Sequence, residues 1–271
     1  MSSERPKGSR LFDGYYSGAA SSGPNAGDDD SAYNELEVTT FGTRTQGLSG
    51  GSRVEDLSVE TFKSSGSLKV KGHARASSFR SSGSVTVMGD LVAVNYKSSG
   101  YSHIHGQAIV GALSSSGSMT VDGGLRGRDS IDASGLLRAP WIRSRGRVDI
   151  SGRVETGTLV CRELFVSGGG RAADVVAETI DIDTRSHHRF GGFLNIHLGG
   201  DKRPFKAQSL TAKGTVSIDL CDVDKVKGSV VRIGKDCHVG HVEYVTSCDV
   251  EKGAVIDNPP TRAASPPVAS R

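Results

Sequence analysis

Four consecutive segments share one pattern and follow one another without a gap, so the chain repeats with a period of about 17 residues. The segments read FKSSGSLKVKGHARASS, FRSSGSVTVMGDLVAVN, YKSSGYSHIHGQAIVGA and LSSSGSMTVDGGLRGRD, and they start at Phe62, Phe79, Tyr96 and Leu113. A repeat of this length buries its apolar side chains only against neighbouring repeats, so several copies are needed for stability. The chain is therefore expected to be a stack of similar units.

Each repeat contains two recurrent glycines, which mark two tight turns where a positive φ angle is expected. After each glycine, apolar and polar residues alternate, as is typical of short strands with one buried side. Leu68 and Val70 form one apolar pair, Ala74 and Ala76 form a second, and Phe62 stands inward on a third strand. The glycines of the first turn are Gly66, Gly83, Gly100 and Gly117, and those of the second are Gly72, Gly89, Gly106 and Gly123.

Three short strands and three turns make one triangular coil, and stacked coils pair their strands as parallel ladders about 4.8 Å apart. The predicted fold is all-β, a parallel β-helix in which each coil is one copy of the repeat. Its core is expected over residues 33–256, between disordered tails at 1–32 and 257–271. One coil is expected to be shortened near residues 126–130, because Gly135 follows Gly123 at less than the usual spacing.

Composition and charge exclude some classes of function. Glycine accounts for 36 of 271 residues and aromatic residues for 6%, so a thin core is expected rather than a large one around a deep pocket. A net charge of +3 does not call for nucleic acid as a partner. The chain lacks a long apolar span and a secretory leader pattern, so we expect a cytoplasmic protein with its four cysteines reduced.

A β-helix leaves two open ends, each with unpaired backbone groups and an exposed core edge. The simplest use of such ends is stacking of one chain on another, which would make the protein its own partner. The alternative is a monomer whose tails fold over the ends.

The SSGS-apolar-x-apolar-x-G repeat, the polar N-terminal segment and the closing stretch VVRIGKDCHVGHVEYVTSCDVEKGAVI together resemble the bactofilins, polymer-forming cytoskeletal proteins of bacteria. The resemblance covers about residues 33–256 and implies a right-handed β-helix that assembles without nucleotide into non-polar filaments. Such filaments are scaffolds that localise cell-wall, shape or motility machinery, often at a membrane. The core is longer than is usual for the family, and residues 185–206 interrupt it.

The resemblance brings no catalytic residue and no cofactor or metal with it. It implies instead that the terminal coils hold the contacts between copies of the chain. By position, these contacts are predicted at Leu36, Val38 and Phe41 at one end, and at Val242, Tyr244, Val250, Val255 and Ile256 at the other.

Residues 185–206 fit no coil and are predicted to protrude from the rod as a loop. Basic and apolar residues alternate in this segment, a pattern that suits contact with an anionic membrane or with a partner protein. The alternative is that its apolar residues fold back over the β-helix. The residues proposed for the contact are Arg189, Phe190, Phe193, Leu194, Lys202, Arg203 and Phe205.

The main rival interpretation is a left-handed β-helix acyltransferase of the hexapeptide-repeat type. Ile233-Gly234 and Val239-Gly240 show one six-residue step, and His238 or His241 would be its general base. The inward steps of the main repeat run 6, 6 and 5, which does not suit a hexapeptide coil, where all steps are equal. An exported surface or adhesin β-helix is a third interpretation, which the lack of a leader pattern disfavours.

Three groups of residues could be assigned chemistry, but a structural role is the favoured interpretation of each. Cys237, Cys248 and the histidines near them match no compact zinc spacing. His103 and His105 lie on one strand face and could hold a metal ion side by side, although a solvated face explains them. Asp181 and Asp183 alternate with inward isoleucines, so outward solvation explains this pair.

Overall fold

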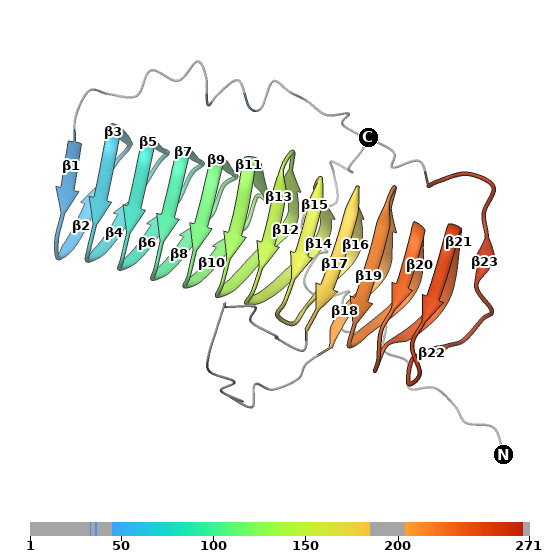
Figure 1. The fold of residues 1–271 in the computed structure, drawn as a ribbon. Coiled ribbons are helices and arrows are strands. Elements are labelled where there is room, and N and C mark those ends of the chain that lie inside the picture. The colour runs from blue at the N-terminus through green and yellow to red at the C-terminus, as the bar shows by residue number, and fades with distance from the viewer. Residues whose placement is uncertain (1–32, 34–35, 37–44, 185–203, 268–271) are drawn as a thin grey trace, which may run out of the picture.

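The computed structural model describes Tyr33, Leu36 and residues 45–184 and 204–267. It confirms the predicted fold: the described strands form one continuous parallel β-helix of about 12 turns, with about 17 residues in each turn (Figure 1). No helix among the described residues has both the length and the apolar character needed to cross a membrane.

Short strands and long strands alternate along most of the rod. Up to the middle of the rod they are β1 (Thr45–Leu48), β2 (Gly51–Val54), β3 (Leu57–Ser64), β4 (Ser67–Val70), β5 (Ala74–Ser81), β6 (Ser84–Val87), β7 (Leu91–Ser98), β8 (Tyr101–Ile104), β9 (Ala108–Ser115), β10 (Ser118–Val121), β11 (Leu125–Ala133) and β12 (Leu136–Ser144). The remainder are β13 (Arg147–Ile150), β14 (Arg153–Val160), β15 (Glu163–Val166), β16 (Gly170–Ala177), β17 (Thr179–Asp183), β18 (Phe205–Ala212), β19 (Thr215–Asp219), β20 (Cys221–Ile233), β21 (His238–Val250), β22 (Val255–Ile256) and β23 (Thr261–Arg262).

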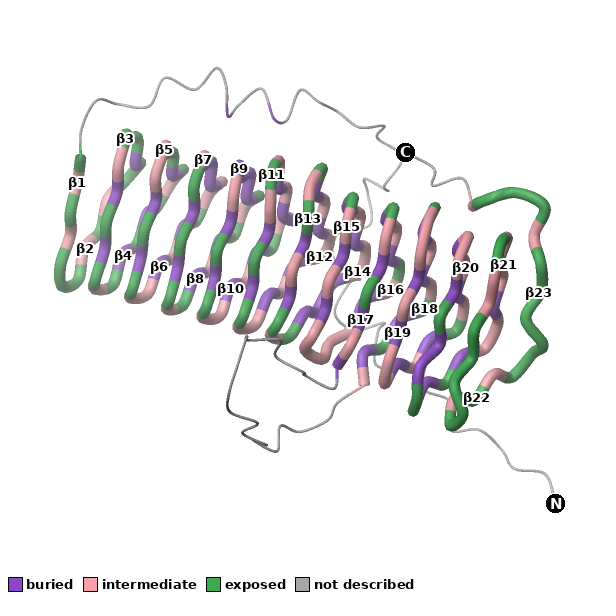
Figure 2. Tube along the Cα trace, in the orientation of Figure 1, coloured by how far each residue is buried: buried purple, intermediate pink, exposed green. Residues whose placement is uncertain are grey.

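Each regular coil has two strands rather than the three predicted, because the long strand continues around one corner of the triangle. In β3 the side chains of Leu57 and Val59 are buried, and the alternation then shifts by one residue, so that Phe62 and Ser64 are the next buried pair. The coil therefore still has three inward sides. Figure 2 shows the resulting alternation of buried and exposed residues along the strands.

The core consists of ladders, in which equivalent residues of successive coils lie side by side. The rings of Phe62 and Phe79 lie 4.8 Å apart, and those of Phe79 and Tyr96 lie 5.2 Å apart. Burial raises the pKa of Tyr96 to about 12, and its hydroxyl donates to Oγ of Ser102 at 2.8 Å. Ser102 therefore replaces the apolar residue of other coils because it satisfies a buried hydroxyl.

The turn glycines are required for space and not for a positive φ angle, contrary to the sequence-based explanation. Among the described residues, only Gly50, Gly124, Gly170 and Gly253 are glycines with positive φ. A Cβ atom added to Gly100 would lie 2.0 Å from the carbonyl oxygen of Gly83 in the preceding coil. Adjacent coils approach too closely at this corner for any side chain.

The predicted shortened coil near residues 126–130 is wrong. Gly135 belongs to the first-turn glycines, since a Cβ on it would lie 1.8 Å from the carbonyl oxygen of Gly117. The spacing between these two glycines exceeds the regular repeat by a single residue, which is absorbed by a shift of register between Gly127 and Ser130 in β11. This coil is therefore slightly longer than its neighbours rather than shorter.

The β-helix continues in register across the interruption between β17 and β18. Strand β16 pairs with β18, and β17 pairs with β19, in the same parallel arrangement as elsewhere. Oγ1 of Thr184 donates to the carbonyl oxygen of Leu220 at 3.3 Å, and the backbone N–H of Phe205 donates to the same oxygen at 3.2 Å. The two ends of the inserted segment are thus fixed to one carbonyl of the next coil.

Backbone pairing passes the predicted core boundary at the C-terminal end, and two described residues near the N-terminal boundary lie on the side of the rod. The first described coil begins at Thr45, and Tyr33 and Leu36 instead cover an outward apolar patch formed by Val92 and Ile109. The Tyr33 hydroxyl donates to the carbonyl oxygen of Gly127 at 3.1 Å. At the other end, the predicted tail is ordered at least to residue 267, and β23 pairs with β21. Backbone pairing therefore extends past residue 256.

Replacing Gly100 with alanine is expected to destabilise the protein by about 1–3 kcal/mol, because the new methyl group overlaps the preceding coil. Gly51→Ala is the matched control, since nothing lies within 4 Å of a Cβ at that glycine. Urea denaturation of the two variants and the parent measures the difference. Equal stability of the two variants would contradict the close-approach explanation.

Candidate functional sites: the two ends and a basic groove

The C-terminal end of the rod exposes part of its apolar interior. Val250 pairs with the buried Ile233, yet it is 44% exposed because no described strand covers its other side. Tyr244, Cys248 and Ile256 are partly buried against the same core. This end of the rod therefore presents apolar surface to solvent.

The structure places the predicted C-terminal contact residues in three different environments. Tyr244, Val250 and Ile256 lie at the exposed end of the interior, and a contact between chains through them stays a prediction. Val255 is exposed but faces outward, because it pairs with the outward His238. Val242 is wrong as an end contact, because its side chain is completely buried in the core and Thr261 donates to its carbonyl oxygen at 3.2 Å.

The N-terminal end is more polar. Gln46 pairs with Phe62, and Ser52 pairs with Leu68, so two apolar ladders end on polar residues. Leu48 and Val54 pack on the core beside them. This coil lies inside the predicted core, and its sequence QGLSGGSRV at residues 46–54 is a degenerate copy of FKSSGSLKV.

The predicted N-terminal contacts do not occupy this face. Leu36 is wrong as an end contact, since it packs against Val92 and Ile109 on the side of the rod. Val38 and Phe41 lie outside the described residues.

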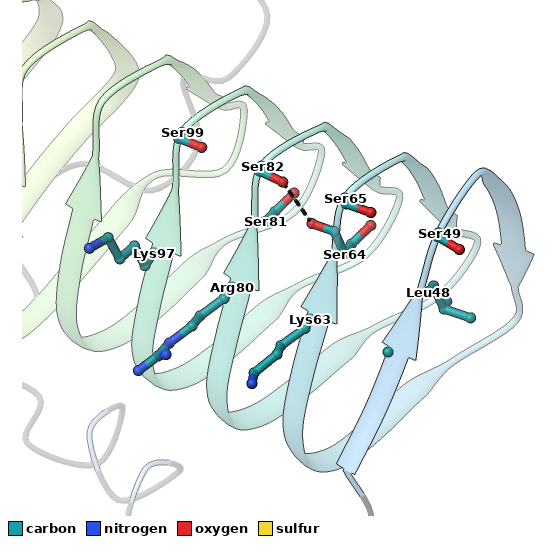
Figure 3. A pocket seen from close by; sticks show the side chains of 11 residues that line it. Leu48, Ser49, Lys63, Ser64, Ser65, Arg80, Ser81, Ser82, Lys97 and Ser99 are labelled. Atoms are coloured by element: carbon teal, nitrogen blue, oxygen red, sulfur yellow. Dashed lines mark hydrogen bonds between the residues drawn. The ribbon is translucent and has the colours of Figure 1, made fainter.

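A groove of about 770 Å³ starts at the N-terminal coil and runs along the outside of the next coils (Figure 3). Lys63, Arg80 and Lys97 line it in register, one from each of three successive long strands. Serines of the turns form its other wall. None of the three cations has a carboxylate partner among the described residues.

Some outward cations elsewhere on the rod are neutralised by a carboxylate of an adjacent coil. Arg138, Glu155 and Arg171 form one such row, and Nη2 of Arg138 lies 2.6 Å from a carboxylate oxygen of Glu155. Burial tends to raise the pKa of Glu155, but the guanidinium groups, with Arg138 first, hold it below its usual value. The groove therefore differs from this row in its uncompensated positive charge.

Removing the central charge of the groove with Arg80→Gln is expected to stabilise the protein by about 0.2–1 kcal/mol at low salt, because like charges on adjacent strands repel. The gain should vanish near 1 M salt, where screening is nearly complete. The control Lys206→Gln breaks an ion pair with Asp222 at 3.0 Å and should bring no gain. Urea midpoints at both salt concentrations measure these effects, and a loss of stability with Arg80→Gln would contradict the expectation.

His238 holds the last coils together on the outer face. Its Nε2 lies 3.0 Å from Asp257, and its Nδ1 lies 3.5 Å from Asp222. The hydrogen bond to Asp257, supported by Asp222, raises the pKa of His238 above 6.5. Both ring nitrogens are therefore engaged with carboxylates, which leaves neither as a free general base in this conformation.

The charge on His238 should make the stability of the C-terminal end depend on pH. A raised folded-state pKa gives stabilisation that is complete below pH 6.5 and is lost as the pH rises through the folded pKa. The parent should therefore exceed His238→Gln in melting temperature at pH 6, and the difference should shrink at pH 9. A difference that stays constant over this range would contradict the role of the charge.

The predicted cysteine–histidine group and the aspartate pair do not form a common site. Cys237 points into the core while His238 points outward, so a zinc ion cannot join them. His241 contacts Glu243 at 3.4 Å, and Cys248 packs against the core edge. Ile180 and Ile182 are fully buried, which confirms that the aspartates beside them face outward.

The predicted membrane or partner loop falls largely outside the described residues. This applies to Arg189, Phe190, Phe193, Leu194, Lys202 and Arg203. Phe205 is described, and its assignment to the loop is wrong. It is the first residue of β18, completely buried, and lies in register beside Gly170, which has no side chain to compete for the space.

Comparisons with family models, with curated proteins and with solved structures find no match for this chain.

Proposed function

We propose that this chain is a structural protein, a rod that associates end to end without nucleotide into filaments and serves as a scaffold for other proteins. The observation that carries the proposal is the exposed C-terminal end. There an inward apolar residue, Val250, remains 44% exposed. Covering it with a second chain would remove apolar surface from water.

The backbone at the ends supports the same proposal. Strand β1 pairs only with β3, and β2 pairs only with β4, among the described strands. At the other end, residues 247–250 of β21 pair with β20, while the short strands β22 and β23 lie along earlier parts of β21. Unpaired edges of this kind are templates for pairing with another strand.

The two ends favour different contacts. Tyr244, Val250 and Ile256 give the C-terminal face an apolar character, whereas Gln46 and Ser52 make the N-terminal face more polar. The C-terminal contact is therefore the stronger one, and two chains join there around a two-fold axis. Filament growth then requires the weaker N-terminal contact, which leads to a non-polar filament of the kind that the bactofilin resemblance implies.

In this proposal the filament lies in the cytoplasm and holds recruited cell-wall or motility proteins, or a membrane surface, through the segment at residues 185–203. The rows of equivalent side chains on the outer faces support a scaffolding role, because a filament repeats each of them at regular intervals. The acyltransferase alternative gains no specific support from the positions of His238 and His241.

The test is negative-stain electron microscopy and analytical ultracentrifugation of the full-length protein without nucleotide. We expect filaments or long rods for the parent and single rods for Val250→Lys, because a buried unpaired charge is costly. The control is Met88→Lys, since Met88 is similarly apolar and exposed, at 42%, but lies on the side of the rod. This control should assemble as the parent does.

Two outcomes would contradict the proposal. Single particles for the parent at all concentrations would overturn end-to-end association itself. Closed dimers that never lengthen would retain the C-terminal contact but overturn filament formation. Circular dichroism of each variant shows whether its β-helix is intact.

A further inference from the structure

Two histidines and one aspartate converge on the outer face of two adjacent coils. His103 lies in β8 and His105 follows it, so the two side chains lie on the same side of the backbone. Their rings lie 4.1 Å apart, centroid to centroid. Asp122 occupies the position equivalent to His105 in the next coil, one repeat later in the chain, since its N–H donates to the carbonyl oxygen of Ile104.

One carboxylate oxygen of Asp122 contacts both histidine rings. Oδ2 of Asp122 lies 3.0 Å from Nε2 of His103 and 2.9 Å from Nδ1 of His105. The three potential ligand atoms all lie within 4.8 Å of one another. No lysine or arginine among the described residues pairs with Asp122.

We propose that His103, His105 and Asp122 form a binding site for a divalent transition metal ion, of which Zn²⁺ is the probe. Imidazole nitrogen with one carboxylate oxygen is a ligand set that suits these ions, whereas Mg²⁺ and Ca²⁺ prefer oxygen ligands alone. Ligand atoms on an ion at about 2.1 Å lie about 3.0 Å apart in octahedral and about 3.4 Å apart in tetrahedral geometry. The observed nitrogen–oxygen distances require little or no movement.

The ion would join adjacent coils, because its ligands come from both. All three side chains are partly exposed, so the ion can enter from solvent, and its remaining coordination positions are open to water. Met88 holds the position equivalent to His105 in the preceding coil. The exposed thioether of Met88 therefore lies beside the proposed site, on the side of the preceding coil.

Among the described residues, the other histidines near carboxylates lack this convergence. His238 faces Asp257 with Nε2 and Asp222 with Nδ1, so its two carboxylates lie on opposite sides of the ring. His73 uses Nδ1 to accept the backbone N–H of Asp90 at 3.0 Å. Convergence on one point, rather than the presence of histidine and aspartate, distinguishes the proposed site.

The test is isothermal titration calorimetry of the full-length protein with Zn²⁺, comparing the parent with the double variant His103→Gln, His105→Gln. Because other histidines and cysteines can bind Zn²⁺, the readout is the difference between proteins. The parent should bind one more ion per chain than the double variant. Asp122→Asn should weaken that ion at least tenfold, and His238→Gln, the matched control, should retain it.

Thermal melting gives an independent readout, because an ion bound only by the folded protein raises its melting temperature. Zn²⁺ should raise that of the parent and of His238→Gln by more than that of the double variant. The comparison is made for each protein with and without Zn²⁺, so that any effect of the substitutions alone is removed. Equal stoichiometry and affinity in the parent and the double variant would overturn the proposal, as would loss of the ion in His238→Gln.

Discussion

The stacking of each coil on the next at the spacing of one β-strand is the constraint on which the rest of the molecule depends. Parallel pairing in register places every residue beside its equivalent in the neighbouring coil. When successive repeats have the same residue type at one position, its side chains therefore form a row along the rod. Phenylalanine gives a row of packed rings, glycine gives a corner where backbones nearly touch, and lysine or arginine gives a row of repelling charges.

Because of this stacking, the candidate functional sites lie on the outer surface of the rod and at its two ends. The interior is filled by the ladders of buried side chains, and the groove lies on the outer surface of the described coils. The outward rows differ in whether neighbouring coils compensate each other. Glu155 is surrounded by guanidinium groups, whereas Lys63, Arg80 and Lys97 have no such partner among the described residues. The two ends differ in a similar way, one apolar and one partly polar.

The repeat was enough to predict the fold, because its period and its alternating apolar residues specify coils and inward sides directly. The prediction failed where a single residue departed from the regular repeat. The extra residue in β11 made Gly135 look like the wrong turn, and Phe205 looked like loop because nothing marks the return of the chain to the core. In a run of consecutive apolar residues on one strand, alternate residues face outward, as Val92 does, but nothing in the sequence indicated that Tyr33 and Leu36 cover it. Alternation along the strand places His103 and His105 on one face. Asp122 joins them only when the residue one repeat after His105 is also considered.

The shared carbonyl of Leu220 has a consequence for how this chain can vary. Because Thr184 and Phe205 both donate to it, the inserted segment leaves and rejoins the β-helix at one point, with the coils on either side still paired. The cost of closing a flexible loop rises by only about 0.6 kcal/mol for each doubling of its length. At this corner, segments of other lengths and binding properties can therefore replace the inserted segment without altering the rod.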